Sequence, residues 1–120
     1  MHMSVSVLLV EDNQIMRTLI ADAITLLDIT VIDCGSAEDA VSVLESSSSI
    51  ALVMTDIRML RCMDGLDLAQ VIWSRWPALP IIITSGHTTA LDGLPANATF
   101  LAKPWTIDVL HRAIRAFLPK

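Results

Sequence analysis

Apolar residues along the chain follow two spacings, one typical of buried strands and the other of helices. Short runs rich in Val, Ile and Leu predict strands that are buried on both faces. These runs lie at 5–10, 30–33, 50–55, 81–85 and 100–102. Between most of them, apolar residues recur every three or four positions, which predicts helices with one apolar face. The alternation of strand and helix, without an internal repeat, predicts one α/β domain with a parallel sheet.

The predicted helices follow residues that can cap a helix N-terminus. Asn13, Ser36 and Thr106 each precede an apolar stripe, and their side-chain oxygens can accept hydrogen bonds from first-turn backbone N–H groups. The expected inner faces are Ile15, Leu19, Ala23, Ile24 and Leu27; Ala37, Ala40, Val41 and Leu44; Leu66, Ala69, Trp73 and Trp76 in a helix over 65–76; and Ile107, Leu110, Ile114 and Phe117.

The segment 88–99 stands where another helix would complete the alternation. It contains Gly93 and Pro95 within twelve residues. Glycine costs backbone entropy in a helix, and proline removes a hydrogen-bond donor and clashes with the preceding turn. We therefore expect a fourth helix that is short or degenerate.

Composition narrows the class of protein. The chain has 120 residues, of which 53% are apolar, enough for one packed domain, and we interpret residues 1–3 as a cloning remnant. A net charge of −5 argues against nucleic-acid binding and against a basic membrane surface. The two cysteines, Cys34 and Cys62, are too few for a disulfide scaffold, and no apolar run is long enough to span a membrane. We expect a soluble, cytoplasmic protein.

Charge is distributed unevenly along the chain. Residues 1–57 contain nine acids and a single base, Arg17, whereas residues 58–120 contain four acids and seven bases. Any positive charge that balances the acids of the early strands must therefore come mainly from the second half.

Polar residues follow the apolar strands at the points where ligands bind in open parallel sheets. The first strand ends in Glu11-Asp12, the third in Asp56, the fourth in Ser85-Gly86 and the fifth in Lys103-Pro104. Each feature alone is common in turns, loops or helix caps. Together they place three carboxylates, one hydroxyl and one ammonium at one edge of the sheet.

This set of groups predicts phosphoryl chemistry with a metal ion. Two carboxylates about 4 Å apart repel by roughly 4 kcal/mol at an effective dielectric near 20, so three of them require a cation. Oxygen ligands favour a hard ion such as Mg²⁺. A carboxylate beside the metal can attack phosphorus and form an acyl phosphate, while the lysine neutralises a phosphoryl oxygen. No cluster of thiolates and imidazoles indicates zinc, and no glycine-rich loop indicates nucleotide binding.

The whole chain resembles the receiver domain of bacterial two-component response regulators. The resemblance rests on VLLVEDN, on ALVMTD followed by MDG, on PIIITSG and on FLAKPW. It implies a single receiver domain with a flavodoxin-like five-stranded sheet, in strand order 2-1-3-4-5, with helices on both faces. It also implies a histidine kinase or histidine phosphotransfer protein as the partner, and a protein that catalyses only its own phosphorylation and dephosphorylation.

The resemblance implies a role for each acid. Asp56 is the phosphoacceptor. Glu11 and Asp12 hold Mg²⁺ directly or through water, together with Asp56 and the backbone carbonyl of Arg58.

The resemblance also implies which residues respond to phosphorylation of Asp56. Ser85 is the hydroxyl that moves toward the phosphoryl group, and Lys103 pairs with Asp56 and then with the phosphate. Phe100 stands at the position of the aromatic switch residue.

The chain departs from the family pattern after Asp56. Leu60 replaces the usual proline, and Arg61-Cys62 makes the loop one residue longer. This longer loop is expected to alter the geometry beside the phosphate. The degenerate helix in 88–99 is a second departure, and because it cannot supply a full helical face, we expect a monomer rather than a phosphorylation-driven dimer.

Two alternative functions stay open. A Mg²⁺-dependent phosphohydrolase could use the same nucleophile, but it needs an acid two residues later, where Arg58 stands. A receiver-like interaction module that is never phosphorylated is the other alternative.

Overall fold

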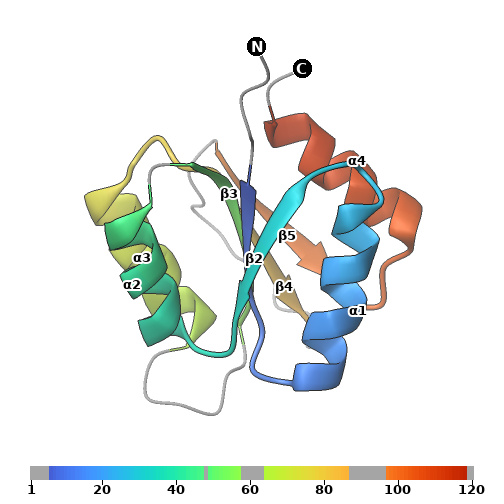
Figure 1. Ribbon diagram of the computed structural model, residues 1–120, viewed down its shortest axis with the longest axis horizontal. Helices are drawn as coiled ribbons and strands as arrows, with labels where there is room; N and C mark the ends of the chain where they lie inside the picture. The colour runs from blue at the N-terminus through green and yellow to red at the C-terminus, as the bar shows by residue number, and fades with distance from the viewer. Residues whose placement is uncertain (1–5, 48, 58–63, 87–96, 119–120) are drawn as a thin grey trace.

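Five parallel strands form one sheet in the order β2-β1-β3-β4-β5 (Figure 1). The computed structural model describes residues 6–47, 49–57, 64–86 and 97–118. The strands are β1 (Ser6–Val10), β2 (Thr30–Cys34), β3 (Ile50–Asp56), β4 (Ile81–Ser85) and β5 (Ala98–Ala102). Strand type, parallel direction and strand order are as predicted. β5 begins two residues before the predicted Phe100 because Ala98 and Thr99 pair with Ile81 and Ile82 of β4.

Four described helices cover the sheet: α1 (Gln14–Thr25), α2 (Ala37–Ser46), α3 (Gly65–Arg75) and α4 (Ile107–Phe117). α1 and α4 lie on one face, and α2 and α3 lie on the other (Figure 1). None of the described helices is long and apolar enough to cross a membrane. The short helix predicted within 88–99 falls mostly outside the described residues.

Side-chain caps begin the helices as predicted. The side chains of Asn13, Ser36 and Thr106 accept hydrogen bonds from backbone N–H groups three residues later, at 3.0, 3.1 and 3.2 Å. α3 begins with a reciprocal capping box between Asp64 and Asp67, which the sequence analysis did not predict. Each cap satisfies backbone donors that have no partner within the helix.

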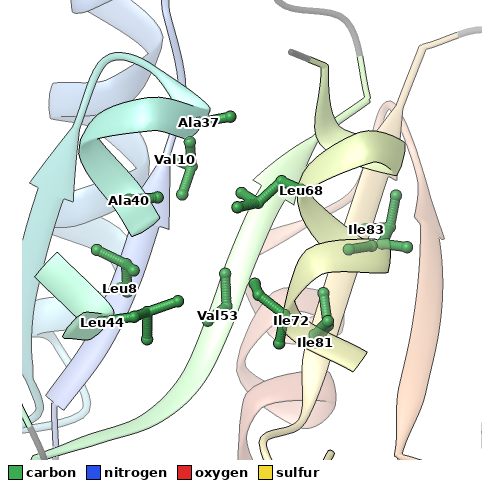
Figure 2. Close-up of a cluster of buried hydrophobic side chains, with 11 residues drawn as sticks. Leu8, Val10, Ala37, Ala40, Leu44, Val53, Leu68, Ile72, Ile81 and Ile83 are labelled. Carbon is green, nitrogen blue, oxygen red and sulfur yellow. The ribbon is translucent and has the colours of Figure 1, made fainter. Parts of the chain in front are cut away.

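The core has two apolar layers, one on each face of the sheet. The layer beneath α2 and α3 contains aliphatic side chains from β1, β3 and β4 packed against Leu44, Leu68 and Ile72 (Figure 2). The layer beneath α1 and α4 is built in the same way around Ile24, Leu110 and Ile114. Burial on both faces explains why the strands are continuous apolar runs.

The predicted inner face of α1 is partly wrong. Ala23 and Ile24 are buried as expected, but Ile15 is 74% exposed and Leu19 is 59% exposed. Ile24 follows Ile15 by nine positions, which is about two and a half turns at 3.6 residues per turn, so the two side chains lie on opposite sides of the helix. Ile20, which the prediction left out, is buried and completes the stripe that faces the sheet.

One residue of the last helix also departs from its prediction. Ile107, the first residue of α4, is 49% exposed, whereas Leu110 and Ile114 are fully buried.

Candidate functional site

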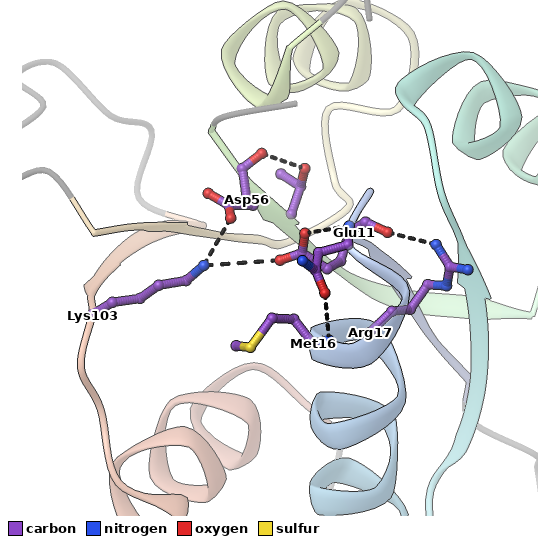
Figure 3. A network of polar contacts seen from close by, with 7 residues as sticks. Glu11, Met16, Arg17, Asp56 and Lys103 are labelled. Carbon is purple, nitrogen blue, oxygen red and sulfur yellow. Dashed lines mark hydrogen bonds and ion pairs between the residues drawn. The ribbon is translucent and has the colours of Figure 1, made fainter. Parts of the chain in front are cut away.

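The carboxyl edge of the sheet brings together side chains from three strands. Glu11 follows β1, Asp56 ends β3, and Lys103 follows β5. The Nζ atom of Lys103 lies 2.7 Å from Oδ2 of Asp56 and 3.8 Å from Oε1 of Glu11 (Figure 3). These residues are 45 and 47 positions apart along the chain, and the parallel strand order places them in one polar cluster.

The backbone and side chain of Glu11 are both held by hydrogen bonds. Its N–H donates to the carbonyl of Cys34 at 3.1 Å, which extends the pairing of β1 with β2. Its carboxylate Oε2 accepts a hydrogen bond from the N–H of Asn13 at 3.0 Å. Its own carbonyl accepts one from Nη1 of Arg17 at 2.8 Å (Figure 3). Glu11 therefore has one defined position although it is a carboxylate with only 3% of its surface exposed.

Burial is the main reason that the Glu11 carboxyl has an abnormal pKa. It raises the pKa of Glu11 from its ordinary value of 4.5 to about 7. A side-chain hydrogen bond with Asp12 and the charge of Asp56 raise the pKa further, while the N–H of Asn13 and the charge of Lys103 lower it. The charge of Lys103 therefore offsets only part of the combined effect of burial, Asp12 and Asp56 on the Glu11 carboxyl.

The other predicted site residues lie at or near the same edge. Ser85 is buried at the end of β4, and its carbonyl accepts a hydrogen bond from the N–H of Lys103 at 2.8 Å. Asp12 is half-buried next to Glu11. Phe100 is half-buried in β5 and packs against the layer beneath α2 and α3. Arg58, predicted to contribute its carbonyl, lies outside the described residues, as do Leu60 and Arg61-Cys62 of the longer loop.

The start of α3 supports the backbone at Asp56. The N–H of Gly65 donates to the carbonyl of Ile57 at 2.9 Å, and the N–H of Ile57 donates to the carbonyl of Thr84 at 2.9 Å. A Cβ at Gly65 would overlap the backbone carbonyl of Asp56, so only glycine allows this approach. The glycine of the MDG motif is therefore required by the geometry around Asp56.

The acids of this edge are suited to a hard divalent cation. No group of three His, Cys, Asp or Glu residues in the described parts of the chain is arranged to hold a metal ion. The donors present are nevertheless carboxylate oxygens, the ligand type that Mg²⁺ prefers. Besides burial, a hydrogen bond with Asp12 and the charge of Asp56 raise the pKa of Glu11, so a cation beside these acids would favour the ionised carboxylate. The donor chemistry therefore fits Mg²⁺.

Comparison with known families identifies the class to which this fold and site belong. The model of the response regulator receiver domain matches residues 7–115. The chain therefore belongs to the response regulator receiver domain family.

Two relatives in sequence are transcriptional regulators. The C4-dicarboxylate transport transcriptional regulatory protein DctD of Rhizobium meliloti is 34% identical over 114 residues, which cover 92% of this chain and 24% of that protein. The transcriptional regulatory protein GlrR of Escherichia coli is 31% identical over 94% of this chain and 26% of its own length. The chain thus spans about a quarter of the length of these relatives.

Solved receiver structures share the fold across nearly the whole chain. A response regulator receiver protein from Sinorhizobium medicae superposes with a TM-score of 0.86 at 31% identity, covering 95% of this chain and 94% of that one. A receiver protein from Pseudomonas putida superposes with a TM-score of 0.82 at 27% identity, covering 97% and 99%.

One residue that contacts the site, Arg17, is not among the predicted site residues. Arg17 donates to the carbonyl of Glu11 from α1 (Figure 3). The sequence does distinguish Arg17, because it is the only Lys or Arg among the first 57 residues and that segment contains nine acids. This isolated positive charge could have indicated a contact with the acidic site.

Proposed function

We propose that this domain accepts a phosphoryl group on Asp56 from a phosphohistidine donor and thereby changes its conformation. The observation that carries the proposal is the contact between Lys103 and Asp56 at the carboxyl edge, with the buried Glu11 beside it. A carboxylate at the end of a buried strand, paired with an ammonium and flanked by further acids, suits nucleophilic attack on phosphorus.

The proposed reaction is a direct phosphoryl transfer. An oxygen of Asp56 forms a bond to phosphorus while the phosphorus–nitrogen bond of the donor histidine breaks, and the electron pair of that bond stays on the imidazole. Lys103 stabilises the negative charge of the phosphoryl oxygens. Glu11, Asp12, Asp56 and the carbonyl of Arg58 would hold Mg²⁺, which when bound supplies further charge neutralisation. Hydrolysis of the acyl phosphate returns the domain to its starting state, and the only reactions proposed for the domain are its own phosphorylation and dephosphorylation.

The exposed apolar residues of α1 support a protein as the phosphoryl donor. Ile15 and Leu19 are large apolar side chains that solvent reaches, and their helix begins three residues after Glu11. Exposed apolar side chains grouped beside a reactive site are typical of a protein contact surface. They support a histidine kinase or a histidine phosphotransfer protein as the partner.

The proposal also covers the class of molecule on which the phosphorylated domain acts. Two relatives are named transcriptional regulators, and another relative, the autoinducer 1 sensor kinase/phosphatase LuxN of Vibrio harveyi, matches this chain over 14% of its own length. With an acidic net charge of −5, this domain is proposed to act on proteins rather than on nucleic acid or membranes, within the cytoplasm.

Phosphorylation of Asp56 is tested with Mg²⁺ and acetyl phosphate, a small acyl-phosphate donor. Intact-protein mass spectrometry should detect one added phosphate that is labile in base and absent from Asp56→Asn. Asp22→Asn, which removes an exposed acid from α1, should be phosphorylated like the wild type. Equal phosphorylation of the Asp56→Asn variant would refute the assignment, and absence of any adduct on the wild type would favour a non-phosphorylated interaction module.

The conformational change is proposed to involve Ser85 and Phe100 without producing a dimer. Sedimentation with and without beryllofluoride and Mg²⁺, a phosphate mimic, should give a monomer in both states. Amide resonances of residues 98–102 should nevertheless shift when the mimic binds. A clean monomer-to-dimer conversion would contradict the proposed oligomeric state.

A further inference from the structure

Arg17 connects three elements around the first acid of the site. Its Nη1 donates to the carbonyl of Glu11 at 2.8 Å, and its Nε lies 3.1 Å from Oδ2 of Asp33 at the end of β2. Its side chain is 20% exposed, and Figure 3 shows it reaching from α1 toward the backbone of Glu11. A guanidinium can donate in two fixed directions at once, which makes it suited to joining a carbonyl and a carboxylate.

The guanidinium also fits closely against the turn after β2. A Cβ at Gly35 would lie 2.8 Å from Nη1 of Arg17, which is closer than side chains tolerate. The backbone N–H of Arg17 donates to the carbonyl of Asn13 at 2.9 Å as the first hydrogen bond of α1, so Arg17 lies in the first turn of the helix that follows Glu11 and Asp12. The position of Arg17 is thus fixed by Asp33 on one side and by Gly35 on the other.

Arg17 holds the backbone of Glu11 in position, and within the described part of the chain it makes no hydrogen bond or ion pair with the Glu11 carboxylate. The guanidinium meets the Glu11 carbonyl, whereas the carboxylate of Glu11 faces Asn13 and Lys103. The acids at this edge repel one another, and repulsion tends to push a short turn away from the site. A hydrogen bond to the backbone of that turn opposes such a displacement without occupying a carboxylate oxygen.

We infer that Arg17 is a positioning residue that holds the Glu11-Asp12 turn in the geometry required for cation binding. The inference rests on the proposed function, because it assigns Glu11 and Asp12 to the metal. Some residues hold metal ligands in place by hydrogen bonds without contacting the metal themselves. Replacing such a residue typically lowers the metal affinity by about 10- to 100-fold. We expect an effect near the lower end of that range, because Arg17 acts on the backbone of Glu11 and not on its carboxylate.

The test measures Mg²⁺ affinity directly, without a phosphoryl donor. Amide resonances of residues 11–13 are followed during titration with MgCl₂ alone. Arg17→Gln should raise the dissociation constant roughly tenfold. Arg17→Lys should have an intermediate effect, since one ammonium cannot reproduce the planar fork. Arg75→Gln is the matched control. Arg75 of α3 also pairs with an acid, Glu45 of α2, at 2.8 Å, but neither residue belongs to the proposed metal site.

Two further variants disturb Arg17 without removing its charge. Asp33→Asn weakens its anchor on β2, and Gly35→Ala displaces its guanidinium by adding a Cβ. Each should raise the dissociation constant by about two- to fivefold, within the range expected for groups that orient a metal ligand indirectly. The double variant Arg17→Gln/Asp33→Asn should bind Mg²⁺ no more weakly than Arg17→Gln alone, because Asp33 acts through Arg17.

The outcomes separate this inference from the proposed function. Wild-type Mg²⁺ affinity in Arg17→Gln, even with a lower melting temperature, would show that Arg17 is only structural and would overturn the inference. If Arg17→Gln does not fold, unchanged affinity in both Asp33→Asn and Gly35→Ala would overturn it equally. Mg²⁺ binding that depends on Arg17 in a protein that acetyl phosphate never modifies would instead refute phosphorylation alone. A wild-type protein without any Mg²⁺ response would overturn both.

Discussion

Replacing Glu11 with glutamine should make the metal-free protein more stable at neutral and higher pH. Glutamine has nearly the same shape as a protonated glutamate, and it can still accept the hydrogen bond from the N–H of Asn13 and donate to Asp12. Unlike ionised glutamate, glutamine carries no charge, so the variant removes a negative charge that is buried beside Asp12 and Asp56. The variant therefore isolates the free-energy cost of ionising Glu11 in the folded protein.

The size of the effect follows from the pKa of Glu11. Because folding raises this pKa from 4.5 to about 7, the folded state binds the Glu11 proton more tightly than the unfolded state does. The stabilisation from that proton is complete below pH 4.5 and is lost as the pH rises to about 7. At about 1.4 kcal/mol per pKa unit, the loss is about 3 kcal/mol, a substantial part of the 5–15 kcal/mol typical of a folded domain.

Urea unfolding in the presence of EDTA, across the range from about pH 4 to about pH 8, measures this difference. Glu11→Gln should match the wild type near the acidic end and exceed it by about 3 kcal/mol near the alkaline end, where its unfolding midpoint should shift by about 1–3 M urea. Glu45→Gln removes a half-exposed carboxylate paired with Arg75 and should change stability by less than about 1 kcal/mol. A Glu11→Gln variant that is less stable than the wild type at about pH 8, or whose difference does not vary with pH, would refute this account of the site.

Four further predictions follow from individual residues. Asp28 has a φ of 58°, so Asp28→Gly should raise the free energy of unfolding by about 1 kcal/mol, and a lower melting temperature would contradict this. Burial raises the pKa of the Cys34 thiol to about 11, so iodoacetamide should modify it slowly in the folded protein and quickly in urea, as peptide mass spectrometry would show; equal rates would contradict this. Gly65→Ala should destabilise the domain by more than about 3 kcal/mol, because its Cβ would meet the backbone of Asp56; near-normal urea unfolding would argue against that contact. Mg²⁺ affinity, measured by titration, should fall as the pH drops below about 7, because the raised pKa of Glu11 leaves this carboxyl increasingly protonated; an affinity independent of pH would exclude Glu11 from the metal site.

Local sequence patterns were sufficient to predict the order of elements and the residues at the edge of the sheet. Strands buried on both faces are continuous apolar runs, and these helices begin where a side chain can cap them. Both features can therefore be recognised in short segments of the sequence. Asn13, Ser36 and Thr106 are caps for this reason. Parallel strands align their carboxyl ends, so the positions of Asp56 and Lys103 after their strands already indicated that they could meet.

The tertiary structure decided what depends on the packing of one element against another. The pattern of α1 contains apolar positions on more than one side, and only its contact with the sheet selects Ile24 for the core and leaves Ile15 in solvent. The raised pKa of Glu11 depends on burial by residues distant in sequence, and the hydrogen bond from Arg17 to its carbonyl depends on the angle at which α1 leaves β1. Spacing along a chain fixes which residues can share a helix face or a strand edge, but distances and burial between elements are set only when the whole domain packs.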